Sequence, residues 1–308
     1  MTRFAPLACP WIPLSLAGLL VATGCGGGTD TTAASATQAS TDSETDETSE
    51  GETTGSESDT DVDTDTDTDT GEPLPPADIP DGCNPVAYAH DCMLPYPSDV
   101  FLADDQTMPS GHRVVLTEAA KPKTNDDQGY DFTGTHPVDG FSHHQPILTL
   151  FPEGVDPSNI TFHQGSDPEA SMLPSSPTLL LNAETGQPIP HWAELDRSTE
   201  LTAKQAFIVR PYVRLESETR YIVAFQHLND ASGAPIPPPL GFAHLLAGEV
   251  EGHPVLEPLA ARYDSDIFPV LEQFGASRQD LQLAWDFTTS SEEHTTRDLL
   301  AMRDDAIA

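Results

Sequence analysis

Hydrophobic and polar positions divide the chain into three stretches. An apolar run, Trp11–Ala22, lies near the start, and polar residues then dominate as far as residue 80. Beyond that point, apolar runs of about four to eight residues alternate with Pro- and Gly-containing segments, a pattern typical of β-strands. The predicted strands between residues 111 and 240 are Arg113–Leu116, Pro146–Phe151, Asn159–Phe162, Thr178–Leu181, Ala206–Arg210 and Arg220–Phe225.

Two helices and one more strand are expected after residue 240. Asp266–Phe274 has a helical pattern that ends at Gly275, and Gln282–Thr288 alternates as a strand does. Ser290 and Glu293 have the spacing of a capping box that opens a second helix. That helix carries apolar side chains on one face, which either packs on the β-domain or needs a partner. The side chains are Leu299, Met302 and Ala306.

Short strands without long helical crossovers predict a mainly β fold, an antiparallel β-sandwich. We expect a signal peptide over residues 1–24, followed by a tether over 25–80. The sandwich, with a disulfide loop at its N-terminal end, is expected over 81–240, and a helix–strand–helix extension over 241–308. The extension is either complete or shortened.

Cys25 follows the features of a secretory signal. Arg3 gives a positive start, the apolar run follows, and small residues precede Cys25. The run is shorter than the ~20 residues of a membrane-spanning helix and contains Pro13. Ala22–Cys25 resembles the lipobox of bacterial lipoproteins, in which the cysteine is acylated. The resemblance implies an exported protein, lipid-anchored at Cys25 in the outer membrane or on the cell surface of a Gram-negative bacterium. A secreted protein with a free Cys25 is the alternative.

The formal charge of −37 changes which partners are expected. Residues 26–80 contain no Lys or Arg, and Asp59–Thr70 is close to an Asp-Thr alternation. Such a segment buries too little apolar surface to fold, so we expect an extended, disordered tether. Nucleic-acid binding needs a basic surface, so nucleic acid is excluded as a partner. Membrane association has to come from the lipid anchor.

Cys83 and Cys92 form an even pair in an exported segment, which predicts a disulfide that closes a small loop. A metal site that includes the neighbouring His90 is the alternative.

The chain contains no Gly-x-Ser-x-Gly nucleophile elbow, and Gly140–His144 comes nearest to one. Ser142 and His143 are adjacent in sequence, whereas catalytic triads converge through the fold. We therefore expect a turn at Ser142 and no catalytic residue.

Histidines cluster at His136, His143 and His144, with Asp139 among them. They are weak candidates for a metal site, because only their spacing supports one. We predict neither a metal nor a cofactor, and a metal hydrolase built on this cluster remains a third possibility.

A second polar group surrounds Trp192. Side chains alternate along a strand, so His191 and Glu194 point to opposite faces. The three residues His191, Glu194 and Asp196 are therefore not expected to form an acid–base set. Trp192 and Trp285 are expected in the core, with Asp286 alternating away from Trp285.

Residues 139–236 resemble bacterial Ig-like domains, through Pro146–Ile160, Phe207–Pro211, Glu218–Val223 and Leu228–Ile236. A wider resemblance covers 83–308. It is to the N-terminal region of secreted or surface α/β-hydrolases, akin to the bacterial virulence-factor lipase N-terminal domain. The motifs that carry it are Cys92–Phe101, Asp139–Ser142, His191–Asp196 and Leu283–Thr288. The resemblance implies an Ig-like module that precedes a catalytic domain and is not itself catalytic.

The sequence thus favours a lipid-anchored surface protein with a non-catalytic Ig-like accessory or binding module. The alternative is the N-terminal portion of a surface lipase or esterase, with an α/β-hydrolase domain outside these residues. The sequence identifies no particular protein or glycan as a partner.

Overall fold

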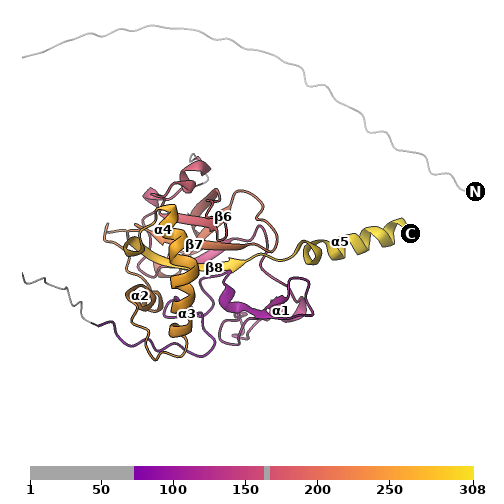
Figure 1. Ribbon diagram of the computed structural model, residues 1–308, viewed down its shortest axis with the longest axis horizontal. Helices are drawn as coiled ribbons and strands as arrows, with labels where there is room; N and C mark the ends of the chain where they lie inside the picture. The colour runs from indigo at the N-terminus through magenta and orange to yellow at the C-terminus, as the bar shows by residue number, and fades with distance from the viewer. Residues whose placement is uncertain (1–72, 163–166) are drawn as a thin grey trace, which may run out of the picture. The chain divides into compact units, whose positions relative to one another are not determined.

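The computed structural model describes residues 73–162 and 167–308 (Figure 1). Three antiparallel sheets with eight strands make this part of the chain mainly β, as predicted. The signal peptide, Cys25 and most of the tether lie outside the described residues, so those assignments stay predictions. No helix within the described ranges is long and apolar enough to cross a bilayer.

Two three-stranded sheets form the centre of the fold. The first has the strand order β3-β6-β5, with β3 (Ile147–Leu150), β5 (His191–Leu195) and β6 (Ala206–Pro211). The second has the order β4-β7-β8, with β4 (Thr178–Asn182), β7 (Arg220–Gln226) and β8 (Leu281–Thr288). A separate two-stranded ribbon joins β1 (Leu102–Asp104) to β2 (His112–Val114).

Aromatic side chains pack the two central sheets against each other. Phe207 on β6 and Phe225 on β7 lie with their ring centroids 5.0 Å apart, edge to face. Phe151 contacts both rings, and Trp285 on β8 stacks on Phe225 at 5.7 Å. Burial of these large rings stabilises the packing of the two sheets. This arrangement is consistent with a β-sandwich.

Helices cover the other face of the β4-β7-β8 sheet. The Tyr263 hydroxyl donates to the Ala284 carbonyl of β8 at 2.7 Å, and Phe242 and Phe268 pack around the Tyr263 ring. Strand β8 is therefore buried on both faces. The helices are α2 (Leu240–Ala247), α3 (Leu256–Arg262) and α4 (Phe268–Phe274), with a π-helical turn at Tyr263–Ile267 between the last two.

Five of the six strands predicted before residue 240 are present, and Asn159–Phe162 is wrong. Pro157–Asn159 forms a 3₁₀ turn instead, capped by the Asp156 carboxylate, which accepts from the Ser158 amide at 3.0 Å. A proline at the first helical position and an aspartate before it favour this turn over a strand. The short α1 (Phe132–Thr135), β1, β5, α2 and α3 add to the predicted elements.

Two predicted boundaries do not coincide with the fold. β8 pairs with β7 from Arg220↔Thr288 to Gln226↔Leu281, so a division at residue 240 would separate neighbouring strands of one sheet. At the other end, residues 73–80 lie on the helices rather than in a free tether. His244 Nε2 contacts the Pro75 carbonyl at 2.9 Å, and His253 Nε2 contacts the Ala77 carbonyl at 3.0 Å.

Cys83 and Cys92 form the predicted disulfide. The loop they close packs on α2, where the Phe242 amide donates to the Val86 carbonyl at 3.0 Å. A β-carbon at Gly241 would lie 1.9 Å from the Pro85 carbonyl oxygen. Glycine at this position therefore allows the close approach of loop and helix.

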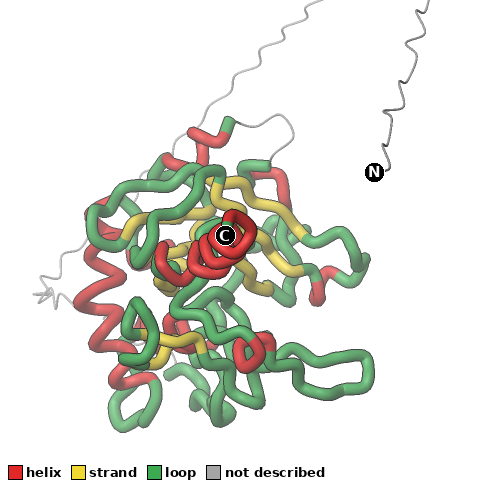
Figure 2. The backbone as a smooth tube through the Cα atoms, turned by 90° about the vertical axis from the view of Figure 1, so that its right-hand side faces the viewer, coloured by secondary structure: helices red, strands yellow, loops and turns green. Residues whose placement is uncertain are grey.

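Helix α5 (Glu292–Ile307) continues from β8 and extends away from the rest of the described domain (Figures 1 and 2). None of its residues is buried, and Leu299 and Met302 are 69% and 67% exposed. Its N-cap is Ser291, which accepts from the His294 amide at 3.0 Å, one residue later than the predicted Ser290. The predicted apolar face thus forms without packing on the sandwich.

Candidate functional site at the root of the C-terminal helix

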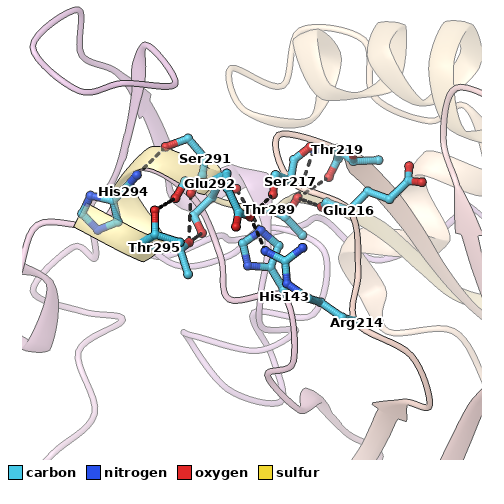
Figure 3. A network of polar contacts seen from close by, with 12 residues as sticks. His143, Arg214, Glu216, Ser217, Thr219, Thr289, Ser291, Glu292, His294 and Thr295 are labelled. Atoms are coloured by element: carbon cyan, nitrogen blue, oxygen red, sulfur yellow. Dashed lines mark hydrogen bonds and ion pairs between the residues drawn. The ribbon is translucent and has the colours of Figure 1, made fainter. Parts of the chain in front are cut away.

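The first turn of α5 is held to the body by a network of polar contacts (Figure 3). The Ser291 amide donates to Asp139 Oδ1 at 3.2 Å, and the Ser291 hydroxyl donates to Asp139 Oδ2. Asp139 is 1% exposed and also accepts from the Ser110 amide at 3.2 Å. One buried carboxylate therefore fixes the residue that caps α5.

An ion pair secures the opposite side of the same turn. Arg214 pairs with Glu292, and the Ser217 hydroxyl donates to Glu292 at 3.0 Å. The hydrogen bond from Arg214 and then that from Ser217 lower the pKa of the Glu292 carboxyl. Acid at the first turn of a helix also complements the helix dipole.

His143 contacts the segment that connects β8 to α5. Its Nε2 lies 3.1 Å from the carbonyl oxygen of Ser290, a residue 147 positions away in sequence. Because a carbonyl oxygen only accepts hydrogen bonds, this nitrogen is the donor. Burial lowers the pKa of His143, and the positive charge of Arg214 lowers it further. Both effects favour the neutral ring. A β-carbon at Gly140 would come within 2.6 Å of the Ser290 amide, so glycine permits this crossing.

A cavity of about 380 Å³ lies beside this network. Its wall includes Tyr96, which packs edge to face on Phe132 and Phe141 at 6.4 and 5.5 Å. Burial raises the pKa of Tyr96 to about 12. The lining contains no Asp, Glu, Lys or Arg. The lining residues are Tyr96, Phe132, His136, Val138, Gly140, Phe141, Ser142, His143, Gln145, Ser290, His294 and Thr295.

Two buried polar atoms of the lining have no hydrogen-bond partner, Gln145 Nε2 and His294 Nδ1. Gln145 uses its carbonyl oxygen, which accepts from the Ser142 amide at 3.4 Å. Native proteins leave few buried donors unsatisfied, so these two atoms mark this cavity as the candidate site.

The fold brings some of the predicted site residues to this cavity and leaves others away from it. Ser142 is exposed, and the Nε2 of His143 bonds to the Ser290 carbonyl rather than to the Ser142 hydroxyl. His136 and His143 line the cavity, whereas His144 does not. Among the described residues, no group of three or more His, Cys, Asp or Glu side chains could hold a metal ion.

The polar residues around Trp192 have separate partners: His191 bonds within the core, whereas Glu194 and Asp196 line a different pocket. His191 is fully buried, with Nε2 at 2.9 Å from the Thr178 hydroxyl and Nδ1 at 2.8 Å from the Ile189 carbonyl. Glu194 pairs instead with Arg210. Trp192 is half-buried, which corrects its predicted place in the core, whereas Trp285 is 1% exposed.

A buried charge cluster was not anticipated from the sequence. Arg262 of α3 pairs with Asp286 and, at 3.4 Å, with Asp99. Burial raises the pKa of Asp286 to about 6, and the neighbouring Asp99 charge adds to this. Asp99 also accepts from the Thr288 amide at 2.8 Å, so it ties the start of the domain to β8. The available signal was an acidic residue, Asp286, within the otherwise apolar run Leu283–Phe287.

No protein-family model matches this chain, and no curated protein matches it in sequence.

Proposed function

We propose that this chain is an exported, lipid-anchored surface protein whose described residues form an Ig-like accessory module that is not catalytic. The observation that carries the accessory role is the contrast within α5: its first turn is fixed by Asp139 and Arg214, while its apolar face is uncovered. Export and lipid attachment rest on the sequence around Cys25. A helix of this length is marginal in water unless it packs. The module therefore serves to support another folded unit along α5.

The Ig-like assignment is supported by Tyr221 at the start of β7. This side chain is 1% exposed, and its hydroxyl accepts from the Glu216 amide at 2.9 Å, five residues upstream. A buried tyrosine bonded back to the preceding corner is a recurrent feature of immunoglobulin-type sandwiches. The aromatic packing between the two sheets agrees with the same architecture.

The non-catalytic assignment is supported by the bonding of the two best nucleophile–base candidates. His143 donates from Nε2 to the Ser290 carbonyl, and no hydrogen bond between its ring and Ser142 is present among the described residues. Ser142 itself contacts the His144 amide at 3.4 Å.

A second function has one specific observation in its favour. The uncovered face of α5, together with the resemblance to surface hydrolases, fits the N-terminal portion of a lipase or esterase whose catalytic domain packs on α5. Both functions give the described residues the same supporting role. They differ in whether the supported unit is a hydrolase.

The surface assignment is tested by labelling cells with an alkynyl fatty acid. We expect the wild-type protein to be labelled and the Cys25→Ala variant to be unlabelled, because the acyl chain is attached to that thiol. Cys9→Ala is the matched control and should be labelled like the wild type. Equal labelling of the wild type and Cys25→Ala would contradict the lipid anchor. External protease that leaves the protein intact on whole cells would contradict its surface location.

A further inference from the structure

The cavity at the root of α5 pairs an apolar wall with polar atoms that have no protein partner. Gln145 Nε2 and His294 Nδ1 are two of the four such buried side-chain atoms among the described residues. The fold brings them to one cavity from positions 149 residues apart in the chain. A donor without an acceptor is costly inside a protein, and a bound molecule with a carbonyl oxygen would satisfy Gln145.

The remainder of the lining favours an uncharged, mainly apolar occupant. Tyr96, Phe132 and Phe141 form an aromatic wall, and no Lys, Arg, Asp or Glu is present to pair with a charge. At about 380 Å³ the cavity falls within the size range of small-ligand pockets. An aromatic ring with an adjacent carbonyl fits these properties.

An apolar stripe continues from the cavity along α5. Thr295 lines the cavity, and Leu299 and Met302 follow it by four and seven residues, so the three share one face of the helix. Leu299 and Met302 are more than half exposed. A ligand confined to the cavity would leave the stripe uncovered, whereas a polypeptide can fill the cavity and cover the stripe together.

We propose that the cavity receives an aromatic anchor side chain from a polypeptide segment that lies along Leu299 and Met302. The peptide carbonyl of the anchor accepts a hydrogen bond from Gln145 Nε2. Buried aromatic anchors in well-packed pockets carry much of the binding energy of protein interfaces. The inference rests on the proposed role of the module as a support for another folded unit, and it assigns the point of contact.

Binding is measured by NMR titration of the mature chain, made as the unanchored Cys25→Ala variant, with N-acetyl-L-phenylalaninamide. We expect roughly millimolar affinity and shifts of the Gln145, His294 and Thr295 signals. N-acetyl-L-alaninamide should bind at least about fivefold more weakly, because it lacks the ring. N-acetyl-Phe-Leu-Leu-amide should bind several-fold more tightly, and Met302→Ser should remove that gain.

Gln145→Met keeps the shape of the side chain and removes the donor, so we expect about fivefold weaker binding of N-acetyl-L-phenylalaninamide. His144→Ala is the matched control, since His144 is exposed and outside the lining, and it should bind as the unsubstituted chain does. Both variants are first checked for an unchanged unfolding temperature. If Gln145→Met unfolds at a lower temperature, Gln145→Glu takes its place as the donor-free variant.

Absence of shifts up to the solubility limit, or undiminished binding to the donor-free variant, would overturn the proposal. Tighter binding of N-acetylglucosamine at the same residues would overturn it in favour of a glycan site. None of these three results bears on acylation at Cys25, so failure of this inference and failure of the proposed surface location are distinguishable.

Discussion

At the scale of single residues, His191 and Asp286 are core side chains whose surroundings oppose their charged forms. His191 is buried between Thr178 and Ile189, and its pKa is lowered to about 4 by burial. Asp286 is buried beside Arg262, and its pKa is raised to about 6. Both side chains are satisfied by protein partners, which indicates structural roles for them.

The two groups give opposite pH dependences of stability. A folded pKa below the ordinary value means that stability from neutral His191 is present above about pH 6.5 and is lost as the pH falls through 4. For Asp286 the folded pKa lies above the ordinary value of 3.8, so stability from the protonated form is present below that value. It is lost as the pH rises through 6. In the wild type the two contributions to the slope of unfolding free energy against pH partly cancel between about pH 4 and 6.

We predict that substituting either side chain reveals the pH dependence that the other one gives to the unfolding free energy. His191→Gln should lose less unfolding free energy than the wild type between pH 6.5 and 4, by up to about 3 kcal/mol, because no buried imidazole is protonated. Asp286→Asn should instead lose more than the wild type on acidification. Urea unfolding at a series of pH values measures both differences. Curves parallel to that of the wild type would show that the two side chains do not control this range.

At the scale of elements, the sequence predicted local structure well wherever the hydrophobic pattern was unambiguous. β4 is a run of leucines, β6 and β7 are rich in β-branched and aromatic residues, and all three appear within one residue of the predicted ends. α2 was missed because it begins after Pro237–Pro239 with no side-chain cap, and its eight residues are apolar on most sides. Its helical form depends on packing against the disulfide loop, which local patterns do not describe.

The position of α5 and its apolar face were predicted from the sequence, but the absence of packing on that face could not be predicted. Its apolar residues have the same spacing as those of a packed helix. Only the fold shows that Leu299 is 69% exposed while Leu245 of α2, at 1%, is in the core.

This difference predicts unequal costs of truncating the two leucines. Leu299→Ala should change the unfolding free energy by less than about 0.5 kcal/mol, as exposed positions do. Leu245→Ala should cost about 2–5 kcal/mol, because it leaves a cavity in the core. Chemical denaturation measures both.

Amides of α5 beyond its first turn should exchange rapidly while those of β7 stay protected. Slow exchange through Met302 in the isolated chain would refute the uncovered helix.

At the scale of the whole molecule, the candidate site depends on residues far apart in the chain. Gln145 and His294 are 149 positions apart, and neither stood out in the sequence. The histidine cluster pointed to the correct neighbourhood for a different reason, since His136 and His143 line the cavity without forming a metal group. Convergence of this kind follows from β8 returning beside β7, a long-range pairing that periodicity cannot reveal.

The assignment of the module as non-catalytic predicts that the purified chain does not hydrolyse short- or long-chain nitrophenyl esters. The physical reason is that no hydrogen bond joins the Ser142 hydroxyl to a histidine ring in the part of the chain that the structure describes. The hydroxyl instead accepts from the His144 backbone amide at 3.4 Å. Release of nitrophenol is followed against a buffer blank. Turnover that disappears in Ser142→Ala, with His144→Ala as control, would contradict the assignment. Turnover that survives Ser142→Ala and stops with a chelator would point to the histidines.

The direct continuation of β8 into α5 has a mechanical consequence. A force applied to α5 is transmitted to the domain along the axis of β8 (Figure 1). It passes through the first turn of α5, which Asp139 and Arg214 hold in place. The hydrogen bonds between β8 and β7 lie across that axis, so the load strains them together in shear instead of opening them one by one. We therefore expect a single high-force rupture when the domain is stretched between residue 73 and α5 in an optical trap. Gradual peeling at low force would contradict this. With the proposed lipid anchor at one end and a load at the other, such a domain would resist tension as one unit.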